Sequence, residues 1–557
     1  MKKIKNIIQL SLLIIAALIG NGCTKNFADK NTNPKLITEE LITPELVLTG
    51  VEVSAGSGLG FANADNYCGM NNREDNAPFE DYFDDAAWNA TYTAITNNLA
   101  AIIRKTADDP ELVNKKAIAR VLKAWIFAQC TDIYGDIPYS ESNKAPDDAV
   151  THPKYDLQKD IYTDLLKELK EAATELDPAK ASYGSADLLY QGDVTKWKKF
   201  ANSLRLRLAL RVRYADAELA KSNITDLAEP DLITSPSDQA LFFTSNDVPA
   251  HWNPDYITLV SYGTGPESKS NFIGKSVLDI LSNGDAHTPL DPRIKIVADT
   301  AYAAWPSTLS PPIPYFGYRG RPLIGSVPVQ EKYPYGYESV SRRSDFWSVP
   351  VIEQPILRAS EVYFALAEAA LYNLITGDAN AYYKKGIEAS IAEYQLFYDR
   401  TKGQLDKVEA IIRPDWTSGD ISQYVAFKQM TDPEISNFLA SSTTTLTGSD
   451  EQQLEQIINQ KIVALFPSGL EGWSEWRRTG YPRVLVASDE TSALHGVSYR
   501  RGHYPSGENL VNTEKIKEAK DRMGGKDEVL NHVWWDANPD APHQHSGAVE
   551  SQPDPWQ

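Results

Sequence analysis

The sequence predicts a mainly α-helical protein, with a tetratricopeptide-like scaffold of helical pairs and an irregular, aromatic- and Pro-rich loop region that carries a few short strands. Two observations support this fold class. Apolar residues recur every three or four positions in long segments on both sides of the middle of the chain, which is typical of amphipathic helices. Between those segments, residues 230–355 are rich in Pro, Gly, Ser and aromatic residues and show little helical period. Their aromatic content argues against disorder, so we expect a functional loop region.

The N-terminus predicts a secretory signal over residues 1–22. Lys2, Lys3 and Lys5 precede an apolar run from Ile7 to Ile19, and small residues lead to Cys23. That run is far shorter than the roughly 20 residues that span a bilayer, so we expect it to be cleaved. A Cys directly after small residues indicates a bacterial lipoprotein that is acylated at Cys23. A secretory signal cut at another position is the alternative, since Gly20 stands where such proteins usually have Leu.

Composition excludes several classes of protein. The chain has 557 residues and a formal charge of -20, which is unfavourable for contacts with nucleic-acid phosphates or anionic lipid. Its only other cysteines, Cys68 and Cys130, are too few for a disulfide scaffold and lack C-x-x-C spacing. Cys130 lies in an apolar stretch, so we expect a small buried hydrophobe there rather than a bridge to Cys68.

Four helices are predicted in the first half of the chain. Their apolar faces run along Trp88–Ile103, Leu112–Cys130, Leu157–Leu176 and Val194–Val212. The second is expected to end in a turn over Thr131–Tyr139, where Gly135 and Pro138 oppose a helix. The fourth also carries Arg205, Arg207, Arg211 and Arg213, which we expect to form structural ion pairs in so acidic a protein.

The clearest helical pair spans Ala359–Tyr394. Gly377 is expected to close the first helix and Asp378 to start the second. Two helices in about 34 residues match the length of a tetratricopeptide unit. Further on, Phe466–Arg483 reads FPSGLEGWSEWRRTGYPR, in which Trp473 and Trp476 share one side of a helical turn that Gly480 and Pro482 end. The tail 536–557 is expected to be extended, with His543 and His545 on a loose surface segment rather than at a metal.

This last run resembles the C-terminal signature of the SusD/RagB family of nutrient-binding outer-membrane lipoproteins of the Bacteroidetes, in its SusD-like branch. Other segments resemble that family in the same order along the chain, although Gly502 and His503 depart from its usual pattern. They are NTNP (31–34), TDIYGDIPYSE (131–141), KWKKFANSLRLRLALR (196–211), DPR (291–293), LRASEVYFALAEAAL (357–371), YKKGIEASIAEY (383–394), YRRGHYPSGEN (499–509) and HVWWD (532–536).

The resemblance implies one SusD-like body over residues 23–557. Its helical scaffold would cover about 36–229 and 356–535, with a ligand-facing insert at about 230–355. It implies a protein anchored in the outer membrane through lipid and facing the cell exterior. Such a protein captures oligosaccharide or a similar nutrient and passes it to a SusC-like TonB-dependent barrel. It implies no catalysis, no cofactor and no metal.

A glycan site needs flat aromatic rings that stack on sugar faces, beside side chains that hydrogen-bond to hydroxyls. We expect the family signature segments to build the scaffold, so Trp473, Trp476, Trp534 and Trp535 are left out. The candidate ligand residues are Trp305, Tyr315, Phe316, Tyr318, Arg319 and Arg321, then Tyr335, Tyr337 and Trp347, and in an early loop Tyr67, Asn71 and Asn72. Peptide or another nutrient is the alternative ligand.

Two other functions remain open from the sequence. A surface glycoside hydrolase needs two carboxylates about 5 to 10 Å apart, and the acid count does not exclude that. The chain has no H-E-x-x-H, G-x-S-x-G or Walker motif. A helical-repeat adhesin or scaffold lipoprotein would use the same helices to hold another protein.

Overall fold

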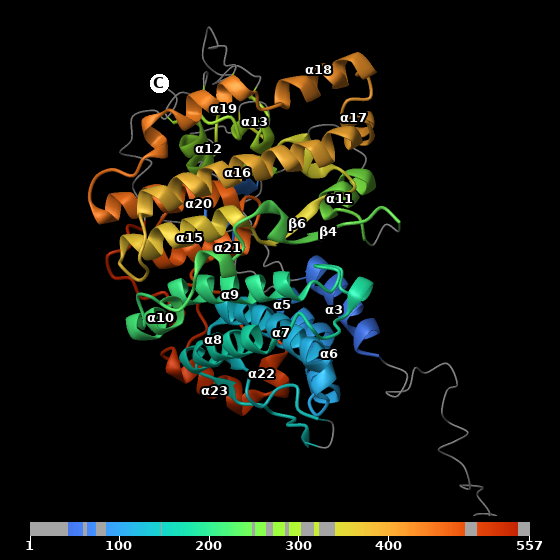
Figure 1. Ribbon diagram of the computed structural model, residues 1–557, viewed down its shortest axis with the longest axis vertical. Coiled ribbons are helices and arrows are strands. Elements are labelled where there is room, and N and C mark those ends of the chain that lie inside the picture. Colours follow the sequence, from blue (N-terminus) through green and yellow to red (C-terminus); the bar gives the residue numbers. More distant parts are fainter. Residues whose placement is uncertain are drawn as a thin grey trace, which may run out of the picture.

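The protein is described from a computed structural model. The structure describes residues 43–58, 64–73, 85–145, 148–247, 251–262, 271–283, 289–301, 317–321, 340–484 and 498–543. Figure 1 shows two groups of helices, one built mainly from the first half of the chain and the other mainly from the second. Helices α9 and α21 lie where the two groups meet. The signal segment and Cys23 lie outside the described residues.

The first group contains the four helices predicted there, and its helices pack on their neighbours in sequence. Helix α6 packs on α7, α7 on α8, and α8 on α9. Two short helices near the C-terminus, α22 and α23, complete the group (Figure 1). The bounds are α3 Pro44–Gly58, α5 Ala86–Asn89, a π-helical turn Ala90–Ile95, α6 Thr96–Lys105, α7 Val113–Tyr134, α8 Gln158–Glu175, α9 Val194–Arg211, α10 Ala217–Ile224, α22 Glu508–Val511 and α23 Thr513–Arg522.

The second group is centred on the predicted helical pair, α15 and α16. These two helices approach so closely that a Cβ on Gly386 would lie 2.8 Å from the Phe364 ring. Helix α15 also packs on α20 and on α9, which joins the two groups. The bounds are α15 Ala359–Leu371, α16 Ala379–Thr401, α17 Leu405–Ile412, α18 Ser418–Lys428, α19 Asp432–Leu439, α20 Asp450–Leu465 and α21 Gly469–Thr479.

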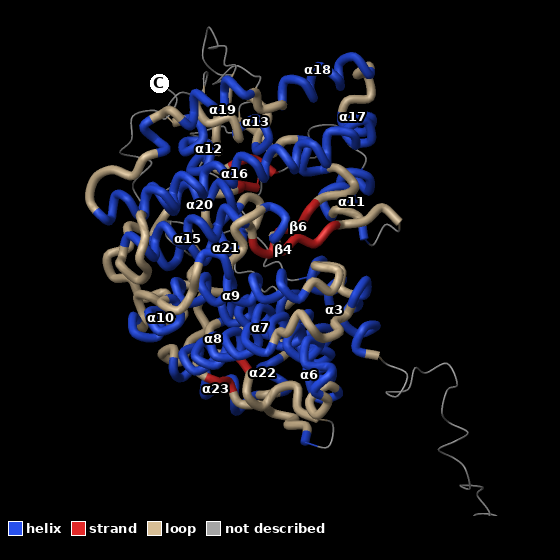
Figure 2. Tube along the Cα trace, in the orientation of Figure 1, coloured by secondary structure: helices blue, strands red, loops and turns tan. Residues whose placement is uncertain are grey.

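Residues 230–355, which separate the two mainly helical parts of the chain, are irregular and carry short strands where the structure describes them, as predicted, but they also contain short helices. Figure 2 shows how little of the structure is strand. Strand β4 (Ala240–Phe243) pairs antiparallel with β6 (Glu353–Leu357), and β1 (Asn71–Arg73) pairs antiparallel with β5 (Asn271–Ile273). A third pair joins β2 (Ile137–Pro138) to β3 (Tyr155–Asp156). The short helices are α11 Pro254–Tyr262, α12 Lys275–Ser282 and α13 Ile294–Val297, with α4 (Ala64–Tyr67) just before β1.

Two predicted helix ends are wrong. Helix α7 continues through Thr131–Tyr134, which we had placed in a turn, and Gly135 ends it with φ 80°. This extra turn places Asp132 among cations of other helices, which the local sequence does not reveal. Helix α15 ends at Leu371, before Gly377, and the left-handed Asn373 (φ 57°) follows it. Asp378 caps α16 as expected, since its carboxylate accepts a hydrogen bond from Asn380 N at 2.9 Å.

The C-terminal signature forms α21, and its two tryptophans are buried as expected for scaffold residues. Gly480 ends the helix in the left-handed conformation, with φ 81°. A Cβ there would lie 2.6 Å from Pro542, so the tail packs against this turn. His543 contacts the Trp476 ring edge-on, at 4.7 Å between centroids, so this part of the tail is not loose. Residues 544–557, including His545, lie outside the described residues. Cys68 and Cys130 are free and buried, which confirms a packing role.

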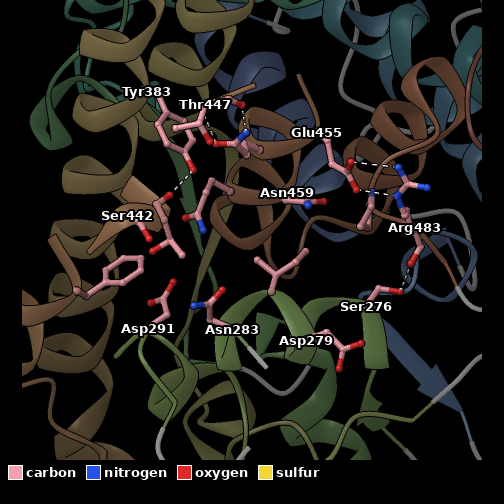
Figure 3. A pocket seen from close by; sticks show the side chains of 16 residues that line it. Ser276, Asp279, Asn283, Asp291, Tyr383, Ser442, Thr447, Glu455, Asn459 and Arg483 are labelled. Atoms are coloured by element: carbon pink, nitrogen blue, oxygen red, sulfur yellow. Dashed lines mark hydrogen bonds and ion pairs between the residues drawn. The ribbon is translucent and has the colours of Figure 1, made fainter. Parts of the chain in front are cut away.

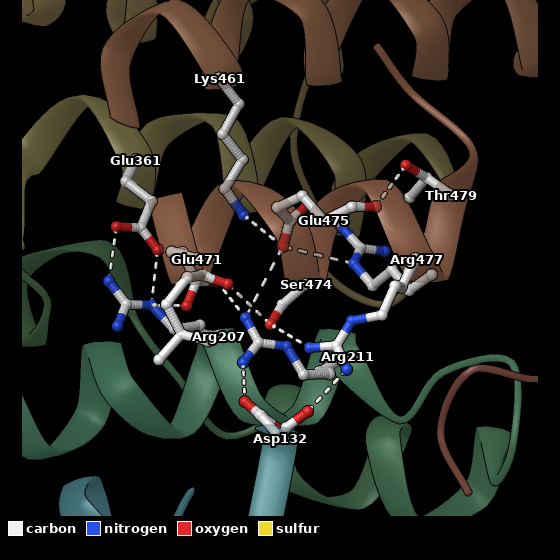
Figure 4. Close-up of polar contacts among 12 residues, drawn as sticks. Asp132, Arg207, Arg211, Glu361, Lys461, Glu471, Ser474, Glu475, Arg477 and Thr479 are labelled. Atoms are coloured by element: carbon white, nitrogen blue, oxygen red, sulfur yellow. Dashed lines mark hydrogen bonds and ion pairs between the residues drawn. The ribbon is translucent and has the colours of Figure 1, made fainter. Parts of the chain in front are cut away.

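A buried network of charged side chains joins the two groups of helices. Figure 4 shows Asp132 from α7 and the arginines of α9 facing acidic residues of α15 and α21. Arg207 donates to both oxygens of Glu361 at 2.6 Å, and Arg211 pairs with Asp132 and Glu471. The α9 arginines are therefore structural ion-pair partners, as predicted.

The same network continues into the second group of helices. Arg478 donates to both oxygens of Glu368 at 2.6 Å and to Glu475 at 2.6 Å. Lys461 of α20 lies 3.1 Å from Glu475. Burial by itself would raise the pKa of Glu475. The charges of Arg478 and Lys461 outweigh burial and bring the pKa below its ordinary value, so the carboxylate stays ionised. Five helices are thus joined by charged side chains that are largely buried.

None of the described helices has both the length and the apolar composition that crossing a membrane requires.

We predict that Arg478→Met lowers the free energy of unfolding by about 3 to 5 kcal/mol, because Glu368 and Glu475 then remain buried without their main cation. Urea unfolding followed by circular dichroism measures this. The matched control is Arg483→Met, whose partner Glu455 lies at the surface with it, so that loss is expected to be below about 1 kcal/mol. Equal losses in the two variants would contradict a structural role for the network.

A second buried carboxylate makes stability depend on pH. Glu52 of α3 accepts a hydrogen bond from Leu188 N at 2.7 Å and lies beside Asp187. Asp187 accepts bonds from three backbone N–H groups and from the indole of Trp197. Burial, followed by the charge of Asp187, raises the pKa of Glu52 to about 9. The folded protein therefore keeps a proton on Glu52 at neutral pH.

We predict that Glu52→Gln gains stability over the parent protein as the pH rises from about 4.5 to about 9. An unfolded Glu ionises near pH 4.3, whereas Glu52 in the fold does so near pH 9, so unfolding releases a proton throughout this window. In this window the free energy of unfolding of the parent falls by at most about 1.4 kcal/mol per pH unit. The glutamine variant has no such proton to release, so its free energy of unfolding does not fall for this reason. Calorimetric melting at about pH 5 and about pH 8 tests this, with exposed Glu514→Gln as the control. A difference in melting temperature between variant and parent that is the same at both pH values refutes it.

Candidate functional site

The predicted site residues gather around a small irregular platform of extended segments. Strand β5 pairs with β1 on one side, and single bridges connect its surroundings to the segments 317–321 and 340–343. The backbone of Arg321 donates to Ile273 O at 2.9 Å, and Ser341 N donates to Arg319 O at 2.7 Å. Several residues of this platform are the chain neighbours of segments outside the described residues. These segments are 74–84, 263–270, 302–316 and 322–339, and the platform residues next to them are 73, 271, 301, 317, 321 and 340. The early loop and the Pro-rich middle therefore meet at one place.

The early candidates lie in β1, which is part of the platform, and in α4 shortly before it. Tyr67 is buried and stacks on Tyr499, with 4.7 Å between ring centroids. Asn71 is also buried, and its amide donates to Asp65 Oδ2 at 2.8 Å. The backbone of Asn72 pairs with Phe272 across the β1–β5 ladder. The contacts of Tyr67 and Asn71 therefore fix β1, and with it the platform, to the core.

The described candidates of the Pro-rich middle are buried in the platform itself. Arg319 and Arg321 are each 3% exposed, and the Arg321 guanidinium lies 5.0 Å from the Phe272 ring centroid. Tyr318 is buried too, and that burial raises the pKa of its hydroxyl. Trp347 is buried against Phe397, at 4.1 Å between centroids, and its indole donates to Ile296 O at 2.9 Å. Trp305, Tyr315, Phe316, Tyr335 and Tyr337 lie outside the described residues.

One cavity borders the platform at Tyr318. This Tyr318 cavity has a volume of about 540 Å³ and is walled by residues before α13, by α18 and by α19. Phe427 is half exposed at its wall, and the ammonium of Lys295 lies 5.8 Å from that ring. Lys295 also pairs with Glu434. An exposed aromatic ring beside a charged pair is one means of holding a sugar face.

A second cavity of about 390 Å³ lies where the two groups of helices meet, and we name it the Trp125 cavity. Helices α3, α7 and α9 supply one wall, and β4, β6, α11 and residues 467–471 supply the other. Trp125 and Phe242 face each other across it with ring centroids 6.3 Å apart. Arg207 and Glu471 of the buried charge network line it as well. The platform contributes Arg343, which pairs with Asp255.

Two polar groups in the Trp125 cavity have no hydrogen-bond partner among the described residues. They are the indole N–H of Trp125, whose side chain is only 4% exposed, and the amide oxygen of Gln129 one helical turn later. Buried polar atoms of folded proteins are normally satisfied, so an unpaired donor and acceptor on one cavity wall fit a hydroxyl-bearing ligand or water. The sequence candidates did not include Trp125 or Gln129. Their only signal was a glutamine on an otherwise apolar helix face.

The carboxylates that line the Trp125 cavity are all paired with arginine. Glu353 is bound by Arg358 at 3.1 Å and by Arg400, and Glu471 by the α9 arginines. Burial by itself would raise the pKa of Glu471, but the charges of Arg207 and Arg211 outweigh burial and lower the pKa below its ordinary value. In the described part of the chain, no three His, Cys, Asp or Glu side chains gather as a metal site requires. The cavity is therefore equipped for hydrogen bonding and stacking.

Comparison with known protein families gives one match. The sequence model of the SusD-like family, described as starch-binding and associating with the outer membrane, matches residues 64–505. A search of curated protein sequences gives no match.

Solved structures with the same fold cover nearly the whole chain. A protein described as chitin-binding is 26% identical, with 89% of this chain and 100% of that chain aligned and a TM-score of 0.70. A SusD homologue from Bacteroides uniformis is 25% identical, with 88% and 97% covered and a TM-score of 0.61. A chitin-binding SusD homologue from Flavobacterium johnsoniae is 23% identical, with 90% of this chain and 97% of that chain aligned and a TM-score of 0.62. At this identity the likeness supports the fold.

Proposed function

The chain belongs to the SusD-like family, and from this membership we propose that it is a surface-exposed nutrient-binding lipoprotein. It captures an oligosaccharide, or a similar nutrient, and passes it to a SusC-like TonB-dependent outer-membrane transporter. The observation that carries the proposal is the family match over residues 64–505. The chitin-binding descriptions of two structurally similar proteins support a glycan as the ligand.

The lipid anchor at Cys23 holds the protein on the outer face of the outer membrane. Between Cys23 and the first described helix, which begins at Pro44, lie 20 residues (24 to 43) of tether. An anchor so close in sequence to the body keeps it near a partner in the same membrane, which raises its effective concentration there.

The glycan contacts the platform and the Trp125 cavity in this proposal. Trp305, Tyr315, Phe316, Tyr335 and Tyr337 belong to segments that adjoin the platform and supply stacking rings. Trp125 and Gln129 supply an unpaired donor and an unpaired acceptor, and a sugar hydroxyl can satisfy both. Tyr318, Arg319, Arg321, Tyr67 and Asn71 support the platform, and Trp347 lines the Trp125 cavity.

Binding without catalysis fits the charges of the site better than hydrolysis. A glycoside hydrolase needs a protonated carboxyl group beside an ionised one. Asp255, Glu353 and Glu471 of the Trp125 cavity are each paired with arginine, and Arg207 and Arg211 outweigh the effect of burial and lower the pKa of Glu471. These carboxylates are engaged in ion pairs rather than arranged as an acid beside a base.

We predict that a transporter of the SusC type co-purifies with the full-length lipoprotein. The test is a pull-down of the tagged protein from gently solubilised outer membranes, followed by mass spectrometry. A large TonB-dependent barrel in near-equal amount is the expected result. A Cys23→Ala variant, which lacks the anchor, is expected to recover much less of it. Recovery of other surface proteins and no barrel would favour an adhesin or scaffold.

We predict that Gln129→Leu weakens glycan binding about three- to tenfold, the effect of losing one hydrogen bond of about 0.5 to 1.5 kcal/mol. Calorimetric titration with soluble chito-oligosaccharides and malto-oligosaccharides measures the affinity. The control is Gln423→Leu, on the exposed face of α18, which is expected to leave it unchanged. Equal affinity of both variants for a sugar that the parent binds would remove the Trp125 cavity from the site.

A further inference from the structure

A third cavity lies in the second group of helices, and no part of the platform's strands lines it. This Asn459 cavity has a volume of about 540 Å³, within the range of roughly 300 to 1,000 Å³ typical of small-molecule sites. Figure 3 shows it between α20 on one wall and α12 with its C-terminal turn on the other. Helix α16, the turn after α19 and the residues that follow α21 complete the lining. It is therefore separate from the site proposed for the transported nutrient.

The carboxylates of this cavity are neutralised by their own cations. Asp279 lies 2.7 Å from Lys275, and Asp291 accepts from Arg293 Nε at 3.0 Å. Glu455 forms a two-point ion pair with Arg483, at 2.7 and 3.1 Å. Two of these pairs reach the surface, since the side chains of Asp279 and Arg483 are 51% and 50% exposed, but none of the carboxylates in the described lining is without a cation. A charged ligand would have to compete with one of these pairs for its partner. The charge pattern favours a neutral ligand.

The cavity also offers hydrogen-bonding groups that the protein does not use. The amide oxygen of Asn459 is buried and has no partner among the described residues. Asn283 projects from the facing wall at the end of α12, as Figure 3 shows, and has a left-handed backbone with φ 50°. The neighbouring amides are already engaged, because Gln456 binds the backbone of Thr447 and Gln460 accepts from Arg293. Asn459 and Asn283 can each donate and accept.

Apolar surface completes the lining. Tyr383 and Phe438 are buried and line the cavity, and Ile280 lies on the α12 wall. The Tyr383 hydroxyl donates to Thr443 O at 2.9 Å, which fixes its ring. Amides on two walls with apolar side chains in the same lining match a small ring that bears both hydroxyls and apolar C–H groups.

We propose that the Asn459 cavity is a second binding site, specific for a small neutral polyhydroxyl ligand of the size of a monosaccharide or disaccharide. Hydroxyl groups both donate and accept, so they satisfy the unpaired amide of Asn459 and reach Asn283 at the same time. This site does not depend on the proposed transport function, because different residues form it.

The test is saturation-transfer NMR on the full-length mature protein with glucose and N-acetylglucosamine as probes. Transfer to these neutral sugars is expected in the parent and is lost in Asn459→Leu, which removes the amide without adding charge. Glucuronate and glucosamine, of similar size but charged, are expected to give little transfer. The matched control is Gln453→Leu, on the same helix but outside the cavity lining, which is expected to keep the signal.

The outcomes separate this proposal from its alternatives. Sugar transfer that survives in Asn459→Leu but is lost in Gln129→Leu assigns the signal to the transport site and overturns the second site. If no sugar transfer depends on Asn459, the cavity holds only water, and this result also overturns the second site. Equal binding of glucuronate would refute the neutral-ligand specificity. An unchanged melting temperature in Asn459→Leu, expected since Leu favours helix, excludes unfolding as the cause of a lost signal.

Discussion

The arrangement of the two helical groups depends on a buried network of ion pairs. Arg207 and Arg211 of α9 reach across the junction to carboxylates of α15 and α21, and Arg211 also pairs with Asp132 of α7. These side chains are almost completely buried. A buried ion is tolerated only when its partner is held in place, so each of these helices fixes the position of the others. Apolar packing alone would allow α9 and α15 to slide, whereas two-point contacts such as Arg207 with Glu361 specify one register.

The position of the candidate site follows from that constraint. Arg207 and Glu471 belong to the network and also line the Trp125 cavity, so the same charges that join the helical groups form part of the site's wall. The platform lies on the second group and borders the cavity through Arg343. Trp125 comes from the first group and Phe242 from the strand between them. The cavity exists only while the two groups keep their relative position.

Local sequence patterns predicted the helices but not their long-range partners. Repeats of apolar residues located α7, α8, α9, α15 and α16, since that period depends only on neighbouring positions. The end of α7 was wrong, because the extra turn is stabilised by Asp132 contacts with residues 79 and 345 positions away. The aromatic content of residues 230–355 indicated a functional region, yet Tyr318 and Trp347 proved to be buried. Trp125 and Gln129 were missed because the sequence does not show that β4 and β6 leave their polar atoms unpaired.

The network also limits how a protein of this kind can move during capture. A clamshell opening between the helical groups would separate Arg207 from Glu361 and Arg211 from Glu471, and each lost buried partner costs several kcal/mol. Such a state would be sparsely populated. The described helices of the two groups are therefore expected to move as one unit. In this way the buried charges that fix the fold also keep the two walls of the Trp125 cavity together, because Arg207 and Glu471 belong to both the network and the cavity lining.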